Sequence, residues 1–206
     1  MRLTLTTFLT LDGVYQGPGG PDEDPEGGFT SGGWSVPYGD QDFGAFATAV
    51  FDRADAFLLG RRTYDIFAAH WPKVTDPADP IASRLNSLPK YVATTGEELP
   101  EWTGTTRLGR NTEAEVATLK ARPGRELQIH GSGALAASLL AAGLVDSLNL
   151  LVFPVAVGAG KRLFTGTTLP TAFRLQQSTT TSRGVVISTY EREGAPTFGS
   201  YALTEE

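Results

Sequence analysis

A chain of 206 residues with 40% hydrophobic and 10% aromatic residues is long enough to bury the core of one domain, and its length does not require two. Its formal net charge of -6 and pI near 5.0 argue against a nucleic-acid surface or an anionic-membrane surface, because both need a basic stripe. With no cysteine, disulfides, thiolate zinc sites and a cysteine nucleophile are excluded, and the sequence predicts no metal site.

The first residues lack the continuous apolar core of a signal peptide, and no run approaches the length of a membrane span. We therefore expect a cytoplasmic protein that acts on a small molecule, without a nucleic-acid or membrane partner. Residues 2–11 alternate threonine with apolar residues and predict a strand. Residues 12–40 are rich in glycine, proline and acids, and predict a long loop of the kind that forms a functional lid or is disordered.

Two helices and a strand follow the loop. Residues 42–53 carry apolar side chains at helical spacing and predict a helix that Asp40 or Asp42 caps. Residues 56–59 predict a short buried strand that ends at Gly60. A second helix is expected over residues 63–70, before Pro72.

The second half of the chain continues the alternation of strands and helices. Thr112 followed by Glu115 is a capping-box pattern and predicts a helix start, with Gly124 just beyond its end. The remaining expected elements are strands at 90–95, 126–131 and 147–155, a small-residue helix at 133–143 closed by Gly143, and a hairpin of strands 173–181 and 185–192.

This order of elements predicts an α/β fold of three layers, α/β/α. We expect a mixed, mostly parallel sheet with helices on both faces and a C-terminal antiparallel hairpin. The whole chain, 1–206, is expected to form a single domain, with a loosely ordered tail over residues 194–206.

The first candidate ligand-binding stretch is Gly60-Arg61-Arg62-Thr63, between a predicted strand and a predicted helix. In open parallel sheets, ligands sit outside the carboxyl ends of strands, where helices begin. Glycine lets a ligand approach the backbone, amides of the first helical turn donate to an anion, and arginine offers a planar fork to phosphate. The alternative is that both arginines are solvated and that Gly60 only makes the turn.

The second stretch contains Gly131, Gly133 and Ala136, which satisfy the G-x-G-x-x-G/A spacing after a predicted strand. In a dinucleotide-binding Rossmann domain an acid about 20 residues later binds the ribose, but here Asp146 precedes the next strand instead of ending it. A standard NAD-binding domain is therefore disfavoured, while a glycine-lined helix start remains expected.

The third stretch ends a predicted strand with Thr94 and Thr95, whose hydroxyls suit a phosphate. Together the three stretches predict a ligand with several phosphates, bound in one electropositive pocket of an otherwise acidic molecule. Arginine without an acidic ribose clamp favours a 2′-phosphate, hence NADPH over NADH.

Four segments resemble one known family: "LTLDG", "LLGRRTYDIF" with the following "WP", "GSGALAASLLAAGLVDSL" and "PVAVGAGKRLF". They are similar to the dihydrofolate reductase-like family, in particular to the branch that contains the reductase domain of riboflavin biosynthesis. The resemblance spans residues 2–192 and implies an NADPH-dependent reductase, often a homodimer. Its implied substrate is a pterin or a ribosylaminopyrimidine such as 5-amino-6-(5-phosphoribosylamino)uracil.

The resemblance also implies roles for the three stretches. Residues 60–63 would hold the adenosine phosphates, and Thr94 and Thr95 the 2′-phosphate side. The pyrophosphate and nicotinamide side would be held by Gly131, Ser132, Gly133, Ala134 and Leu135. The segment 154–164 would border the substrate, with Val155, Gly158, Gly160 and Lys161 as candidate contacts.

The long loop contains four scattered aromatic residues, Tyr15, Phe29, Trp34 and Tyr38. We expect them either to lie over a planar ligand or to cover the edge of the core. We take Trp34 as the candidate substrate contact among them.

Reduction of a C=N or C=O group needs a proton donor, and two aspartates are candidates. Asp42 begins the helix before Gly60, where a dihydrofolate reductase keeps its carboxylate, and Asp12 ends the first predicted strand. The alternatives are a helix cap for Asp42 and a turn for Asp12. His70 is interpreted as a surface or capping residue, and His130 as a residue that packs or bonds the backbone.

The chain departs from a dedicated riboflavin enzyme because it has no cysteine, and so no zinc deaminase site of the Cys/His type. A stand-alone reductase remains consistent with this. The alternatives are dihydrofolate reductase activity and a non-catalytic dimeric module that binds NADPH or another ligand.

Overall fold

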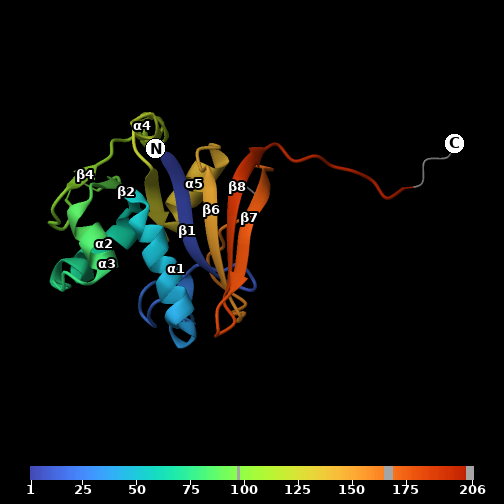
Figure 1. The fold of residues 1–206 in the computed structure, drawn as a ribbon, viewed down its shortest axis with the longest axis horizontal. Coiled ribbons are helices and arrows are strands. Elements are labelled where there is room, and N and C mark those ends of the chain that lie inside the picture. Colours follow the sequence, from blue (N-terminus) through green and yellow to red (C-terminus); the bar gives the residue numbers. More distant parts are fainter. Residues whose placement is uncertain (97, 165–168, 203–206) are drawn as a thin grey trace.

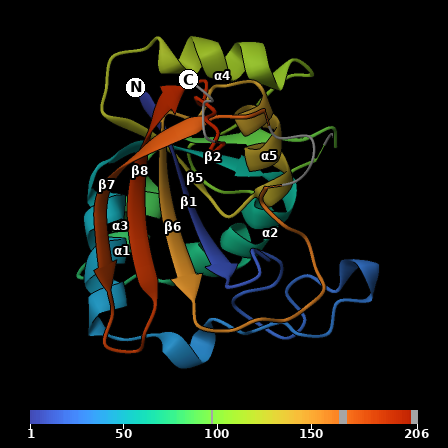
Figure 2. The same cartoon turned by 90° about the vertical axis from the view of Figure 1, so that its right-hand side faces the viewer.

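The computed structural model describes residues 1–96, 98–164 and 169–202. Within them the strands form one sheet in the order β4-β3-β2-β5-β1-β6-β8-β7 (Figures 1 and 2). The strands are β1 (Arg2–Thr10), β2 (Ala54–Gly60), β3 (Lys90–Ala93), β4 (Thr105–Arg107), β5 (Glu126–His130), β6 (Ser147–Phe153), β7 (Ala172–Thr180) and β8 (Val186–Gly194). The α-helices are α1 (Gln41–Asp52), α2 (Arg61–His70), α3 (Pro80–Ser87), α4 (Thr112–Lys120) and α5 (Gly133–Ala141), and the 3-10 helices are η1 (Glu26–Gly28), η2 (Val36–Tyr38) and η3 (Trp71–Lys73).

Strand direction follows the prediction. Every neighbouring pair from β4 to β6 is parallel, whereas β8 runs antiparallel to β6 and β7 runs antiparallel to β8. The predicted mixed, mostly parallel sheet with a C-terminal antiparallel hairpin is confirmed. The hairpin turns at Ser182-Arg183-Gly184, where Gly184 has a φ of 82°.

The sheet is covered on both faces, as the alternation of side chains along β2 shows. Phe57 and Leu59 pack with α2 and α3 on one face, and Leu58 packs with α4 and α5 on the other. A strand buried on both faces reads as a continuous apolar run, which explains the unbroken pattern of this segment. The predicted three-layer arrangement is therefore confirmed.

Two predicted helix starts are displaced by one or two residues. Helix α2 begins at Arg61 rather than Thr63, because Gly60 is its N-cap and both arginines lie in its first turn. Helix α4 is capped by Asn111, whose side chain accepts from the amide of Ala114, so the predicted Thr112 cap is wrong. The predicted cap of α1 by Asp40 is confirmed by its bond with the amide of Phe43.

Sequence reasoning missed helix α3 and strand β4. The signal for α3 was present, because Asp79 accepts from two amides of the first turn and Pro80 occupies the first helical position. Strand β4 is only three residues long, too short for a period-two pattern to identify.

The long loop at residues 12–40 is packed against the body of the molecule. Phe29 and Trp34 are buried with Phe153 of β6, and Gln16 of the same loop is also buried. Figure 2 shows the loop beside the segment that follows β6, and the two are joined by a bridge between Val14 and Arg162. The loop therefore lies at the carboxyl ends of β1 and β6, where it adjoins the candidate site.

Strand β8 continues to Gly194, after which residues 195–202 extend away from the body (Figure 1). Phe198 and Tyr201 are exposed on this tail. The last residues of the predicted tail, 203–206, lie outside the described residues.

In the described part of the chain, no helix combines the length and the apolar character that crossing a membrane requires.

Candidate active site

Strands β2 and β5 are neighbours in the sheet, but the helices that follow them pack on opposite faces. Residues of α2 share a core cluster with residues of α1 and α3, whereas residues of α5 share one with residues of α4. Such a switch point, at the carboxyl ends of parallel strands, is where open α/β sheets bind their ligands. The predicted stretches that begin at Gly60 and Gly131 both lie here.

The two helix starts are joined by side-chain hydrogen bonds. The Gly60 amide donates to Ser132 Oγ at 2.9 Å, and the Ser132 amide donates to Thr63 Oγ1 at 3.1 Å. A left-handed turn makes this possible, since φ is 55° at Gly131 and 51° at Ser132. Leu135 lies next to Gly60 as well. The structure thus brings the first two predicted stretches into contact.

Both helices present their N-termini at this junction without a side-chain cap. The N-cap of α2 is Gly60 and that of α5 is Ser132, and neither bonds the first turn of its helix with its side chain. Uncapped amides at a helix N-terminus favour a bound anion, through hydrogen bonds and the helix dipole. Ala134 is exposed in the first turn of α5, so the turn is open to a ligand on the side of this residue.

Tyr15 of the long loop covers the start of α5. A Cβ added at Gly133 would lie 2.0 Å from Tyr15 Cζ, so the ring rests directly on this glycine. The Tyr15 amide donates to the carbonyl of Lys161 at 3.0 Å, which ties the loop to the segment after β6. Burial raises the pKa of the Tyr15 phenol above its ordinary value, so the hydroxyl stays protonated at neutral pH.

The third stretch lies beside α2. Thr94 and Thr95 follow β3 rather than ending it, and Thr94 Oγ1 accepts from the amide of Gly96 at 3.0 Å. A Cβ at Gly96 would lie 3.0 Å from Arg61 Nη1, which places this guanidinium against the threonine turn. Arg107 of β4 also reaches the turn, donating to the carbonyl of Gly96 at 2.9 Å. Sequence reasoning missed Arg107, because its strand was not recognised.

The cations of the predicted site have internal carboxylate partners. Arg61 pairs with Asp65 at 2.8 Å, one helical turn away. Arg62 and Lys161 pair with Asp24 and Glu26 of the long loop. The three predicted cations thus face three carboxylates, so the formal excess of positive charge at the site comes from Arg107, and the electropositive pocket stays a prediction. Two of these three acids, Asp24 and Glu26, come from the long loop, whose path could not be predicted from the sequence.

Asp12 organises the segment after β6. Its carboxylate accepts from Thr10 Oγ1 at 2.6 Å and from the amides of Val157 and Gly158 at 3.2 and 2.9 Å. The bond from Thr10, with those of the amides, lowers the pKa of Asp12. A carboxyl held ionised in this way lacks the proton that a general acid must give. The geometry therefore supports the turn interpretation of Asp12, and its catalytic role stays a prediction.

The glycines of the same segment meet the long loop closely. Gly160 has a φ of 129°, and a Cβ there would lie 2.7 Å from Val14. Gly158 has a φ of 81°, and its amide is bonded to Asp12. The Val155 carbonyl accepts from the amide of Leu11 at 2.8 Å. These contacts place the segment beside the end of β1, and substrate contacts there stay predictions.

Two predicted site residues are not brought to the junction of α2 and α5. The Asp42 carboxylate accepts from the amide of Ser182 at 2.9 Å, in the turn of the hairpin. Trp34 is 7% exposed, and its indole donates to the Gln16 carbonyl at 2.8 Å. Its ring packs edge-on against Phe153, with centroids 5.4 Å apart. The geometry favours core packing for Trp34 and a structural contact for Asp42.

His130 packs in the core at the end of β5. Its ring stacks on Phe51 with centroids 4.3 Å apart, and its Nε2 lies 3.0 Å from Gln128 Oε1. Burial lowers the pKa of His130 to about 3, so the ring is neutral at physiological pH. The packing interpretation of His130 agrees with this geometry.

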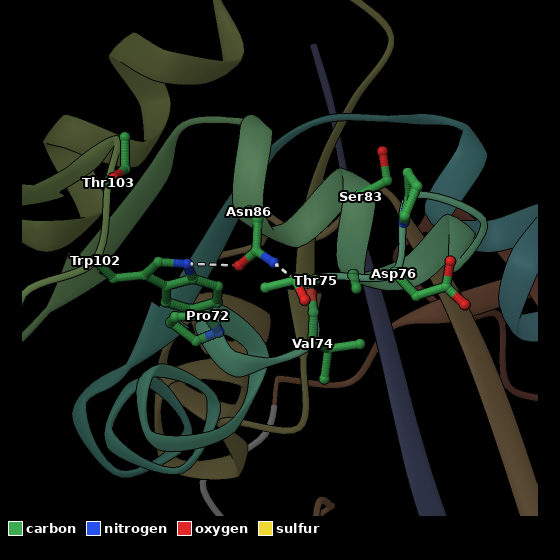
Figure 3. A pocket seen from close by; sticks show the side chains of 10 residues that line it. Pro72, Val74, Thr75, Asp76, Ser83, Asn86, Trp102 and Thr103 are labelled. Atoms are coloured by element: carbon green, nitrogen blue, oxygen red, sulfur yellow. Dashed lines mark hydrogen bonds between the residues drawn. The ribbon is translucent and has the colours of Figure 1, made fainter.

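A separate hollow of about 360 Å³ lies between η3, α3 and the segment before β4 (Figure 3). Trp102 forms one wall, and its indole donates to Asn86 at 3.0 Å, while Asn86 donates to the carbonyl of Val74 at 3.4 Å (Figure 3). The polar groups at its centre therefore satisfy one another. None of the residues predicted to bind a cofactor or substrate lines it.

The sheet order and the helix starts meeting at the switch point define a dihydrofolate reductase-like α/β fold. The sequence profile of the RibD C-terminal domain matches residues 2–187, which is most of the chain. The protein belongs to this family, that of the reductase domain of riboflavin biosynthesis.

The chain is also similar to individual proteins. The uncharacterized protein YyaP of Bacillus subtilis (strain 168) is 29% identical over 200 residues, which cover 94% of this chain and 96% of YyaP. A putative riboflavin biosynthesis protein from Shewanella sp. PV-4 has a similar structure, with a TM-score of 0.64 at 22% identity, over 94% of this chain and 99% of that chain.

Two further structures share the fold at lower identity. A pyrimidine reductase-like protein from Corynebacterium diphtheriae gives a TM-score of 0.60 at 14% identity, over 93% of this chain and 91% of that chain. A diaminohydroxyphosphoribosylaminopyrimidine deaminase/5-amino-6-(5-phosphoribosylamino)uracil reductase from Thermotoga maritima gives 0.61 at 13% identity, over 93% of this chain and 56% of that chain.

Proposed function

We propose that this protein is an NADPH-dependent reductase that transfers hydride to a pterin-like or ribosylaminopyrimidine-like substrate. The observation that carries the proposal is the meeting of two uncapped helix N-termini, those of α2 and α5, at the switch point between β2 and β5. Membership of the RibD C-terminal domain family supports the reductase class. The printed names of two structural neighbours, a pyrimidine reductase-like protein and a 5-amino-6-(5-phosphoribosylamino)uracil reductase, support the substrate class.

The donor groups at this junction fit a dinucleotide. Amides at the starts of α2 and α5 suit a pyrophosphate, because both helix dipoles favour negative charge there. Arg61 and Arg107, with the hydroxyls of Thr94 and Thr95, suit the additional phosphate of NADPH, because all four belong to one turn and its neighbours. NADPH, when bound, supplies the hydride, and the protein supplies orientation and a proton.

We propose Tyr15 as the proton donor. Its ring lies on Gly133 at the start of α5, and its backbone is bonded to Lys161 of the segment that borders the site. Its raised pKa keeps the hydroxyl protonated, whereas the lowered pKa of Asp12 keeps that carboxyl ionised. Asp42 remains the alternative that the family resemblance implies. Its contact with Ser182 directs it toward the hairpin instead.

A homodimer is part of the proposal. Leu175, Val186 and Tyr190 share one face of the hairpin, and Leu175 and Val186 are 51% and 39% exposed. In Figure 2 no helix lies in front of this part of β7 and β8. A second copy of the chain would cover these apolar side chains. The cytoplasmic location expected from the sequence stays a prediction.

The direct test compares the binding of NADPH and NADH by nucleotide fluorescence, followed by NADPH oxidation with candidate pterins and ribosylaminopyrimidines. We expect tighter binding of NADPH, and a rise in melting temperature at saturating NADPH, since a ligand that binds the folded state stabilises it. Equal affinity for the two nucleotides would reject NADPH dependence. A protein that NADPH neither binds nor stabilises would reject the reductase proposal.

A further inference from the structure

One carboxylate oxygen of the long loop joins two cations from distant parts of the chain. Glu26 Oε2 accepts from Arg62 Nη2 at 2.9 Å and from Lys161 Nζ at 2.6 Å. Arg62 belongs to the first turn of α2, and Lys161 belongs to the segment after β6. Two positively charged donors that meet at one anionic oxygen form the arrangement by which proteins bind a phosphate oxygen.

Asp24 holds the same two cations from the other side. One of its oxygens accepts from Arg62, and the other accepts from Lys161 Nζ at 2.8 Å. Asp24 is 7% exposed and is therefore fixed within the packed loop. The side chain of Glu26 is 61% exposed, so its carboxylate can exchange protein contacts for water at small cost. Glu26 can therefore break its contacts with Arg62 and Lys161 more readily than Asp24 can.

The backbone around these acids is held independently of the ion pairs. Gln16 Nε2 donates to the carbonyls of Asp24 and Glu26 at 3.0 and 2.9 Å, and Gln16 Oε1 accepts from the amide of Lys161 at 3.0 Å. Gln16 is 2% exposed. Rotation of the Glu26 side chain alone is enough to free its own place between the two cations, since Asp24 still holds the cations and Gln16 still joins the loop to the Lys161 segment.

We propose that Arg62 and Lys161 form a single binding site for a phosphate group, that Asp24 positions the two cations, and that Glu26 is an internal substitute for the phosphate that the ligand displaces. The inference rests on the proposed function only for the source of the phosphate, which is the cofactor pyrophosphate or a sugar phosphate of the substrate. The acids of the loop therefore set the affinity for the ligand without contacting it.

The test uses calorimetric titration of the full chain with pyrophosphate and with inorganic phosphate. Glu26→Gln removes the competing charge, so binding of both anions should tighten by about 3- to 10-fold. Asp24→Asn removes the same charge but releases the cations from their positions, so binding should weaken. Asp22→Asn, an exposed acid of the same loop, is the control for net charge and should change affinity by less than about 2-fold.

Unchanged or weaker binding in Glu26→Gln, or no measurable binding of either anion by this variant, would overturn the proposal. An equal gain in Asp22→Asn would do the same, because it would reduce the effect to net charge. Lys161→Met in the Glu26→Gln background should remove the gain, and this comparison remains valid if Asp24→Asn fails to fold in a thermal melt. A gain that survives Lys161→Met would contradict a shared site.

Parallel titrations with NADPH and ribose 5-phosphate identify the source of the phosphate. The ligand whose affinity rises in Glu26→Gln is the one that displaces Glu26. If pyrophosphate binds more tightly to Glu26→Gln but NADPH does not bind at all, the anion site stands and the proposed reductase function fails. If NADPH binds well and no titration responds to Glu26→Gln, the reductase function stands and the anion site fails.

Discussion

The ring of Tyr15 occupies the space that a side chain at position 133 would need, because a Cβ there would lie 2.0 Å from Tyr15 Cζ. Gly133 is the first residue of α5, so the contact joins the long loop to a helix start at the switch point. A glycine that looked in the sequence like part of a phosphate fingerprint is thus also required by a packing contact.

Gly133→Ala should destabilise the protein by about 1–3 kcal/mol, because the added methyl group overpacks against an aromatic ring. Gly44→Ala is the matched control within α1, where no atom lies within 4 Å of the new Cβ. It should stabilise by about 0.5–1 kcal/mol through helix propensity. Urea unfolding of both variants measures the contrast. In a Tyr15→Ala background the cost of Gly133→Ala should largely disappear, and a cost that persists would place the strain elsewhere.

Arg61→Ala should weaken NADPH binding by about 10- to 100-fold and NADH binding much less, because Arg61 lies against the turn that holds Thr94. Nucleotide fluorescence titration measures both affinities. Arg84→Ala is the control, since Arg84 pairs with Asp52 on the surface of α3 and α1. Equal losses for NADPH and NADH in Arg61→Ala would show that this guanidinium does not distinguish the two nucleotides.

Tyr15→Phe should lower kcat by about 100-fold or more while leaving the Kd for NADPH nearly unchanged, because it removes one hydroxyl and keeps the ring on Gly133. Steady-state kinetics with the best substrate, together with nucleotide titration, separates the two effects. Asp12→Asn is the comparison, since an ionised carboxylate gives up no proton. Loss of kcat in Asp12→Asn with full activity in Tyr15→Phe would return the proton donor to the aspartate.

Asp12 should also make stability depend on pH at the acid end. Its pKa is lower in the folded protein than in the unfolded chain, so its stabilising contribution is present above the unfolded value of 3.8 and is lost as pH falls through the folded value. Asp12→Asn should show a smaller loss of melting temperature than the wild type over this acid range. An equal loss of melting temperature in the two proteins over this range would show that Asp12 is not the group responsible.

Lys90 should produce a second rise of stability with pH, at the alkaline end. It is fully buried, with Nζ donating to the carbonyls of Leu85 and Leu88 and lying 4.5 Å from the Trp102 ring centroid. Burial lowers the pKa of Lys90 to about 8. Between that value and the unfolded value of about 10.4, only the unfolded chain binds the proton, so stability should rise with pH.

The rise should stay below about 3 kcal/mol, because the two carbonyls and the aromatic ring stabilise the charged form. Urea unfolding of wild type and Lys90→Met on either side of this window measures it. The Lys73→Met variant, at an exposed lysine of η3, should keep the wild-type slope. A Lys90→Met protein with the same alkaline slope as the wild type would assign the effect to another group.

Leu175→Glu should dissociate a homodimer formed through the exposed face of β7 and β8, because it places a charge among Leu175, Val186 and Tyr190. Sedimentation velocity measures the mass of the particle. Gln177→Glu introduces the same charge on the other face of β7 and should leave the dimer intact. A monomeric wild type, or a dimer unaffected by Leu175→Glu, would exclude this interface.

Elements with strong periodic signals were predicted closely. Strand β6 and helix α5 were recognised because their apolar runs are long and bounded by turn residues, and Gly143 ends α5 with a φ of 66° as expected. Boundaries shifted where two start signals competed, as at Asn111 and Thr112. Helix α3 was missed although Asp79 and Pro80 mark its start, because its eight residues are too few for a clear helical period.

The sequence by itself determined the order of strands and helices, the glycines and threonines at their junctions, and hence which stretches end at the same edge of the sheet. These properties depend on local periodicity and turn chemistry, which nearby residues specify. Only the tertiary structure decided that Asp24 and Glu26 pair with Arg62 and Lys161, and that Tyr15 rests on Gly133. Such contacts join residues far apart in the chain, and the path of an irregular loop follows from packing against its surroundings, which no local pattern encodes.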